Sequence, residues 1–207
     1  MKITKDQHAI LVGTLLGDGT LERNGKYVRL RIEHGLRQKQ YLFWKYRALK
    51  PFITKPPRTV VSYQRIAKRA YKRLHFSTYS LAQLEPYWNA FYPHGKKRIT
   101  ELVCKWLRDP VSLAVWFMDD GSIKSKKHKG VFLNTQGFTK NDILKLQKAL
   151  EQNFGIKSTT RMDKNRQQIY LGGTAGEKFC ALINPYVIPS MRYKIPQSLR
   201  LTELPKE

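Results

Sequence analysis

The sequence predicts an α+β protein made of two pseudo-symmetric halves, each with the order helix, two strands, helix, two strands, helix. Three observations predict this class: a repeat with an offset of about 100 residues, alternating apolar residues typical of half-buried strands, and longer segments with helical periodicity. We expect one half to span residues 1–100 and the other residues 101–207. An Asp109-Pro110 pair separates them just before the second copy of the first helix.

Each half begins with an apolar, helix-like segment that ends in Asp-Gly. These segments are LVGTLLGDG at residues 11–19 and LAVWFMDDG at residues 113–121. At the same offset, His34-Gly35 in the first half matches Gln136-Gly137 in the second. Matches that keep one register over such a distance predict two similarly folded halves in one chain.

The Asp-Gly pairs place a carboxylate at the end of each of these helices, because glycine commonly follows a helix C-terminus. Three small residues, Gly13, Gly17 and Ala114, lie where two helices could approach closely. We therefore expect the two motif helices to pack at the interface between the halves, about a pseudo-twofold axis. Asp18 and Asp120 would then lie at adjacent helix ends.

The strands and the remaining helices follow local signals. Asn24-Gly25 is the strongest hairpin signal in the chain, and the segment KYVRLRIE at residues 26–33 alternates apolar and polar side chains after it. One face of such a strand packs, and its arginine-rich face stays open to a ligand. Segments 37–53 and 139–154 have helical periodicity, and we expect them to cover the opposite side of each sheet.

The composition predicts a polyanionic partner. The chain has 39 Lys+Arg against 15 Asp+Glu, a net charge of +24, yet it is 41% hydrophobic and 12% aromatic, which excludes a disordered basic tail. Twelve Lys and Arg, and no acidic residue, lie between Glu33 and Glu85, interleaved with aromatic and β-branched residues. This strand-like pattern favours nucleic acid over a membrane surface, and no apolar run reaches the roughly 18 residues of a membrane span.

Cysteine usage and the N-terminus exclude other classes of protein. Cys104 and Cys180 lie in apolar surroundings, which predicts reduced, buried thiols rather than a disulfide framework or a zinc site. The N-terminus has no apolar signal region. We therefore expect a protein that is not secreted and that works inside a cell, in an organelle or a prokaryotic cytoplasm.

Two carboxylates at adjacent helix C-termini are electrostatically unfavourable, because each C-terminus already carries about half a negative charge. A bound cation makes the arrangement favourable. Carboxylate and carbonyl oxygens are the ligands of Mg²⁺, and divalent metals beside a scissile phosphate promote phosphodiester hydrolysis. A single Asp-Gly after an apolar run is usually only a turn, but its repetition in a strongly basic chain favours a metal site.

The two apolar motifs, with FLNTQGFT at residues 132–139 and PYVIPSMRYKIP at residues 185–196, resemble those of single-chain LAGLIDADG homing endonucleases. The second half is especially similar to members encoded in yeast mitochondrial introns. The first motif is the looser copy, with Thr14 and Leu16 where the family has Leu and Asp. The resemblance covers most of the chain and implies two sheets that form a DNA-binding saddle along the major groove.

By position, the resemblance also implies the metal ligands. Asp18 and Asp120 match the final acidic residue of each motif, which binds the metal in this family. Gly17 and Asp119 match the preceding position, and they would contribute main-chain carbonyl oxygens. The cofactor implied is Mg²⁺ or Mn²⁺.

The family has a basic residue near each catalytic centre, after the last strand of each half. These positions match Lys97 and Lys194, whose charge would stabilise the transition state or lower the pKa of the attacking water. Aligning the two halves with each other puts Arg98 opposite Lys194 instead. The choice between Lys97 and Arg98 therefore stays open, and a simple phosphate contact by Lys97 is the alternative role.

Side chains on the outward strand faces are the expected DNA contacts, since Arg and Gln can pair with the edges of guanine and adenine. The residues expected there are Arg29, Arg31, Tyr63, Arg65, Tyr71, Arg73, Arg161, Arg166, Gln168 and Tyr170. Lysines after the second motif, among them Lys124 and Lys126, are expected to contact phosphates. Because the halves differ in sequence, the target should be asymmetric.

Together these features predict a monomeric, site-specific endonuclease that cuts double-stranded DNA at a long target. The resemblance implies 3′ overhangs and a role in intron mobility. Two alternatives are a maturase that binds its own intron RNA and a DNA-binding relative that has lost cleavage. Retention of both aspartates argues against lost cleavage, but it leaves an RNA role open.

Overall fold

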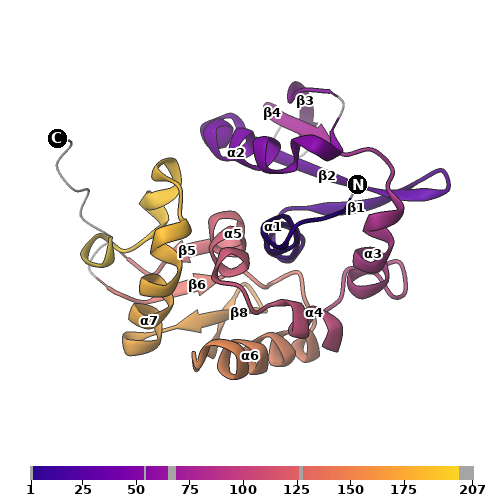
Figure 1. Cartoon of the computed structure of the whole chain (residues 1–207). Helices are drawn as coiled ribbons and strands as arrows, with labels where there is room; N and C mark the ends of the chain where they lie inside the picture. Colours follow the sequence, from indigo (N-terminus) through magenta and orange to yellow (C-terminus); the bar gives the residue numbers. More distant parts are fainter. Residues whose placement is uncertain (1, 54, 65–68, 126–127, 201–207) are drawn as a thin grey trace.

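The protein consists of two four-stranded antiparallel sheets that lie on either side of a central helix pair, α1 and α5 (Figure 1). The computed structural model describes residues 2–53, 55–64, 69–125 and 128–200. Helices α2 and α6 pack on the first and second sheet respectively. None of the helices formed by these residues is both long enough and apolar enough to cross a membrane.

The expected order of elements is confirmed in both halves. The first half contains α1 (Lys5–Leu16), β1 (Thr20–Asn24), β2 (Tyr27–Gly35), α2 (Lys39–Leu49), β3 (Arg58–Gln64), β4 (Arg69–Ser77) and α3 (Glu85–Phe91). The second contains α5 (Pro110–Asp120), β5 (Gly121–Ile123), β6 (Val131–Leu133), α6 (Lys140–Phe154), β7 (Thr159–Asp163), β8 (Arg166–Leu171) and α7 (Gly173–Ile183). A short helix that the sequence did not predict, α4 (Glu101–Trp106), joins them. The sheets have the matching strand orders β1-β2-β4-β3 and β5-β6-β8-β7.

Local sequence signals set the helix boundaries. Thr4 and Gln7 form a reciprocal capping box at the start of α1, and Thr139 forms one with Asp142 at the start of α6. Asp109 caps α5, with a proline at its first position. These caps satisfy backbone N–H groups that a helix start leaves without partners.

The first hairpin shows the predicted alternation. Val28, Leu30 and Ile32 are fully buried on one face of β2, while the arginines between them lie on the other. Gly25 has φ +68°, a left-handed conformation that suits glycine, and the connecting loop is Gly25-Lys26. The loop therefore lies one residue later than the Asn-Gly signal indicated.

Close packing of α1 against α5 confirms the expected helix interface. A Cβ atom on Gly13 would lie 2.4 Å from the Ser112 carbonyl oxygen, and one on Gly17 would lie 2.4 Å from the Asp119 Cβ. Ala114 is fully buried in the same interface. Only glycine fits at Gly13 in α1 and at Gly17, the C-cap of that helix, so these two residues determine how near the halves approach.

Gly13→Ala is expected to destabilise the protein by about 2 kcal/mol, because its Cβ meets a backbone atom that cannot turn away. Helix propensity alone would predict the opposite change, a stabilisation of about 1 kcal/mol, because alanine forms helices better than glycine. A loss of stability would therefore report the clash at the helix interface. Urea unfolding measures the change. Gly137→Ala is the matched control, because its Cβ would meet nothing within 4 Å. A Gly13→Ala protein as stable as the parent would contradict the packing described above.

Both cysteines are free thiols, as expected. Cys180 is buried and Cys104 half-buried. Burial raises the pKa of the Cys180 thiol to about 12 and, aided by Glu101, that of Cys104 to about 11. Both thiols are therefore protonated and unreactive at neutral pH.

Candidate active site and nucleic-acid interface

The structure brings Asp18 and Asp120 to neighbouring ends of the central helix pair. Asp120 is the last residue of α5, and Asp18 lies two residues past the end of α1. The Asp18 side chain is 41% exposed. Two carboxylates are thus held at a solvent-accessible centre between the halves.

Lys97 and Lys194 reach this centre from the two halves in matching ways. The Lys97 Nζ donates to the Gly17 carbonyl at 2.8 Å and to that of Gly19 at 3.0 Å. The Lys194 Nζ, in the turn Pro189–Lys194, donates to the carbonyls of Met118 at 2.6 Å and Asp119 at 2.7 Å. Each ammonium group therefore offsets the partial negative charge of one helix C-terminus.

Arg98 does not reach the centre. Its Nε lies 3.0 Å from the Asp142 carboxylate, and its Nη2 donates to the Thr139 hydroxyl at 3.2 Å. Arg98 thus connects the segment after α3 to the start of α6. Of the two candidates that the sequence left open, only Lys97 lies beside the carboxylates.

The carbonyls of Gly17 and Asp119, which the resemblance assigns to metals, accept hydrogen bonds from these lysines. A carbonyl oxygen has two lone pairs, so one acceptor position remains on each. The Asp119 side chain, unlike its main-chain carbonyl, forms an ion pair: the Lys45 Nζ donates to both carboxylate oxygens at 2.7 and 2.8 Å. The sequence did not indicate this buried ion pair.

A second neighbour that the sequence did not indicate is His34. Its Nδ1 lies 3.4 Å from the Asp18 carboxylate, and its Nε2 lies 3.6 Å from that of Asp119. In the second half, the matching Gln136 donates instead to Asp163 at 2.9 Å and to Gln168 at 3.3 Å. The repeat alignment gave the only signal, because it paired His34 with Gln136 without assigning a role to either.

The two metal-ligand candidates differ electrostatically. Burial and the negative charges of Asp18 and Asp119 raise the pKa of Asp120 to about 7, against the effect of the two lysines. Burial also raises the pKa of Asp18, but contact with His34 and the charges of His34, Lys45 and Lys194 outweigh it, so the net shift is downward. Burial lowers the pKa of Lys97 to about 8, although the three aspartates oppose this shift.

The donor set at this centre fits a divalent metal. Asp18 and Asp120 supply carboxylate oxygens, the ligands that Mg²⁺ and Mn²⁺ prefer. Burial raises the pKa of Asp120, and the negative charges of Asp18 and Asp119 raise it further, so a bound cation would favour its charged form. Oxygen and nitrogen atoms of Asp18, His34 and Asp119 also lie within 4.8 Å of one another. The Asp119 carboxylate is fully buried, pairs with Lys45 and also accepts the Asp18 N–H, so Asp18 and Asp120 remain the candidate ligands.

Asp120→Asn is expected to stabilise the metal-free protein at pH 8. The folded protein holds a proton on Asp120 up to about pH 7, whereas the unfolded chain releases it near pH 3.8. The contribution of this group to the stability of the parent is therefore full below pH 3.8 and is lost as the pH rises through about 7, a loss that the uncharged asparagine avoids. After a discount for partial exposure to water, the gain at pH 8 should be about 2 kcal/mol.

Urea unfolding in EDTA at pH 5 and pH 8 tests this expectation, and added Mg²⁺ should stabilise the parent but not the variant. Equal stability of the two proteins at pH 8 would mean that the folded protein does not disfavour the charged form of Asp120.

Ion pairs arrange the arginines on the outward face of the first sheet. Arg29 donates to the Glu22 carboxylate at 2.8 and 3.0 Å. Arg31 bonds to Glu22 at 3.3 Å and to Glu33 at 3.0 Å, and Arg73 lies 3.7 Å from Glu33. Such exposed pairs contribute little to stability. They align three guanidinium groups along one face.

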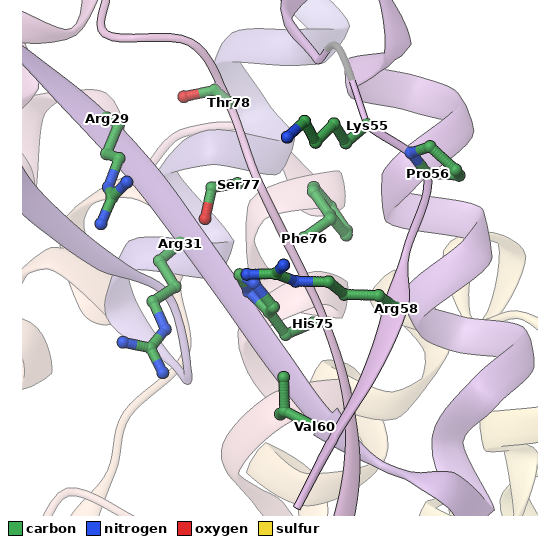
Figure 2. Close-up of a pocket in the computed structure, with 10 residues that line it drawn as sticks. All are labelled: Arg29, Arg31, Lys55, Pro56, Arg58, Val60, His75, Phe76, Ser77 and Thr78. Atoms are coloured by element: carbon green, nitrogen blue, oxygen red, sulfur yellow. The ribbon is translucent and has the colours of Figure 1, made fainter.

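A polar pocket of about 430 Å³ opens on the same face, beside these arginines (Figure 2). Figure 2 shows Arg29 and Arg31 extending side by side, while the Arg58 head group lies next to His75. Arg58 and His75 are direct neighbours across β3 and β4. Burial and the charges of Arg58 and Arg31 lower the pKa of His75. The pocket therefore concentrates positive charge and suits an anionic group.

The strand register corrects one expected DNA contact. Tyr63 pairs with Ala70, and it therefore lies on the face of Leu74, opposite to Tyr71 and Arg73. The expectation that Tyr63 shares a face with Tyr71 is wrong. Two further candidates, Arg65 and Lys126, lie outside the residues that the structure describes.

The second sheet does present its candidates together. Arg161 pairs with Gln168 across β7 and β8, and Arg166 and Tyr170 lie on the same face. The Tyr170 ring has the Arg161 guanidinium 5.3 Å and the Lys124 Nζ 5.8 Å from its centre. Two cations thus lie close to the Tyr170 ring, and their positive charge suits a polyanion.

The chain as a whole is similar to several known proteins. The chain is similar to the DNA endonuclease I-ChuI of Chlamydomonas applanata, with 29% identity over 94% of this chain and 96% of that protein. It is also similar to the cytochrome b mRNA maturase bI2 of Debaryomyces hansenii, with 29% identity over 93% of this chain and 74% of that protein. Among solved structures, the homing endonuclease I-WcaI bound to its DNA recognition sequence matches with a TM-score of 0.86 and 28% identity, over 94% of this chain and 87% of that one.

The sequence pattern of the LAGLIDADG DNA endonuclease family matches residues 8–179, which is most of the chain. The two halves of the fold, each with one motif helix, lie within a single polypeptide. The chain therefore belongs to the LAGLIDADG DNA endonuclease family.

Proposed function

We propose that this protein is a site-specific endonuclease that hydrolyses both strands of a DNA target, with a divalent metal as cofactor. The observation that carries the proposal is the pair of carboxylates, Asp18 and Asp120, held between two basic sheets. The similarity to a homing endonuclease that binds DNA supports it over nearly the whole chain.

In this proposal the two sheets contact the DNA on either side of the centre. The outward arginines of the first sheet would contact base edges and phosphates in the major groove. On the second sheet, Tyr170 and the neighbouring Arg161 and Lys124 would do the same. Because these surfaces differ, the target is asymmetric. The affinity of the protein for DNA should fall steeply as the salt concentration rises, as it does for proteins that neutralise many phosphates.

Each active-centre residue has a proposed role. Asp18 and Asp120 would hold Mg²⁺ or Mn²⁺, which when bound polarises the scissile phosphate and activates a water. Lys97 and Lys194 would place a positive charge near the phosphate as its negative charge increases. The lysine hydrogen bonds also fix the helix ends on which the aspartates are mounted. Cleavage across the minor groove would leave 3′ overhangs.

The protein would act as a monomer whose halves span residues 1–100 and 101–207. It would work in the compartment that holds the intron-bearing DNA, such as an organelle or a prokaryotic cytoplasm. Cleavage there would promote intron mobility. Selection of cleavable sites from a randomised DNA library with Mg²⁺ tests the activity directly. One enriched, asymmetric site supports the proposal, and no cleavage of any library member with Mg²⁺ or Mn²⁺ would refute it.

A second candidate function is assistance to the folding of an intron RNA. The similarity to a maturase over 93% of this chain favours it, and the net charge of +24 suits RNA as well as DNA. Gel-shift competition between the selected duplex and the host intron RNA separates the two functions. An RNA that binds as tightly as the duplex supports the second function, and binding no tighter than to random RNA excludes it.

A further inference from the structure

We propose that Lys45 is a positioning residue of the catalytic centre, and that it acts across the interface between the halves, through Asp119, on Asp18. The inference rests on the proposed endonuclease function. It assigns a role to the one lysine that is fully buried among the described residues.

The contact of Lys45 with Asp119 joins the two halves. Lys45 lies on α2 of the first half and Asp119 on α5 of the second, and neither side chain is exposed to solvent. The Lys45 Nζ donates to both carboxylate oxygens. Tyr41, one turn earlier on α2, donates to the Val115 carbonyl at 3.1 Å, and its ring lies 4.5 Å from the Lys45 Nζ. Helix α2 thus contacts the C-terminal half of the opposite motif helix at two points.

The Asp119 carboxylate in turn positions the backbone of Asp18. Its Oδ2 accepts a hydrogen bond from the Asp18 backbone N–H at 3.3 Å. The absence of a side chain at Gly17 makes the room, since a Cβ there would lie 2.6 Å from the same oxygen. The ammonium of Lys45 therefore fixes a carboxylate that in turn fixes the backbone of a proposed metal ligand.

This connection occurs once, in spite of the repeat. The residue matching Asp119 in the first motif is Gly17, which has no side chain to bind. The residue matching Lys45 on α6 is Gln147, and it donates to the Ser158 carbonyl of its own half at 3.0 Å. The Asp18 side of the centre is thus fixed by a cross-half ion pair, and the Asp120 side has no counterpart in the described structure.

A buried ion pair is a weak source of stability, because the cost of removing both charges from water offsets most of their attraction. An apolar pair of similar volume would hold the halves together equally well. What an apolar pair lacks is an oriented oxygen for the Asp18 N–H. This difference separates a positioning role from a purely structural one.

The test is a double-mutant cycle of Lys45→Met and Asp119→Asn, measured by thermal unfolding and by cleavage of the selected duplex. Each single variant leaves one buried polar group without its partner, so its melting temperature should fall by roughly 10 °C. The double variant removes both charges and should recover most of that loss. The amide that replaces the Asp119 carboxylate keeps an acceptor oxygen, but nothing orients it.

We expect the double variant to keep the parental KM but to lose about tenfold in kcat, equivalent to about 1.4 kcal/mol of barrier. Nicked DNA should accumulate, because the Asp18 side is impaired more than the Asp120 side. Lys39→Met, an exposed lysine six residues earlier in the chain, is the matched control and should behave like the parent.

Two results would overturn the inference. A double variant that cuts both strands at the parental rate would show that the ion pair is only structural. Single variants that melt with the parent would show that the pair does not form. A parent protein that cuts no DNA is a separate outcome, which refutes the proposed function rather than the ion pair, since the melting data would still report the pair.

Discussion

Asp18→Asn and Asp120→Asn are each expected to reduce the rate of double-strand cleavage by at least ~10³-fold, a loss of about 4 kcal/mol of transition-state stabilisation. Asparagine keeps the size of the side chain but removes the charge that holds a divalent cation. DNA binding should be unchanged or tighter, because the substitution removes a negative charge from a centre that must approach a phosphate. Cleavage time courses with Mg²⁺, beside a gel shift in Ca²⁺ or EDTA, measure the two effects separately.

The matched control is Asp6→Asn, an exposed aspartate in the first turn of α1, at the opposite end of the helix from Asp18. It should cut like the parent. If Asp18→Asn or Asp120→Asn cuts as fast as Asp6→Asn, the active-site assignment is wrong, whatever the family resemblance.

Lys97→Met and Lys194→Met form the second large prediction, with an expected loss of about 10²-fold in kcat for each. Methionine retains most of the aliphatic stem but cannot place a charge near the phosphate. Both lysines hydrogen-bond to main-chain carbonyls at the centre and do not belong to the outward faces of the two sheets, which are the proposed DNA-binding surfaces. The KM for DNA should therefore change little. Steady-state kinetics on the selected duplex separate kcat from KM.

Two neighbours of Lys97 serve as controls. Lys96→Met is exposed and should be neutral. Arg98→Met removes the ion pair with Asp142 and should lower stability without lowering kcat of the folded protein. The assignment fails if Arg98→Met loses kcat and Lys97→Met does not, which would restore the alternative that the alignment of the two halves had left open.

Most of the fold was predictable because its signals are local. The alternation after Asn24 fixed the buried face of β2, and the Asp-Gly pairs fixed the ends of the motif helices. The pairing of β3 with β4 was not fixed, since it depends on contacts between separate segments, and a shift of one residue reverses every side chain. The incorrect face assigned to Tyr63 has this origin.

The site was predictable only where it repeats. Asp18, Asp120 and Lys194 stand in motifs that recur or resemble a family, so position alone was enough to propose them. Lys45 and Asp119 are 74 residues apart, and no motif links them. One signal existed, because Lys45 lies at helical spacing from the buried Tyr41 and Leu49, on the apolar face of its helix. A lysine in that position needs a buried partner.

The unequal strand lengths of the two sheets have a consequence for how much of a target each half can cover. Strand β4 has nine residues and β8 has six, which at about 3.3 Å per residue gives roughly 30 Å and 20 Å. At about 3.4 Å per base pair, strands that follow the groove would span about nine base pairs on one side and six on the other. A nuclease-protection footprint should therefore extend further from the cut on the side bound by the first half.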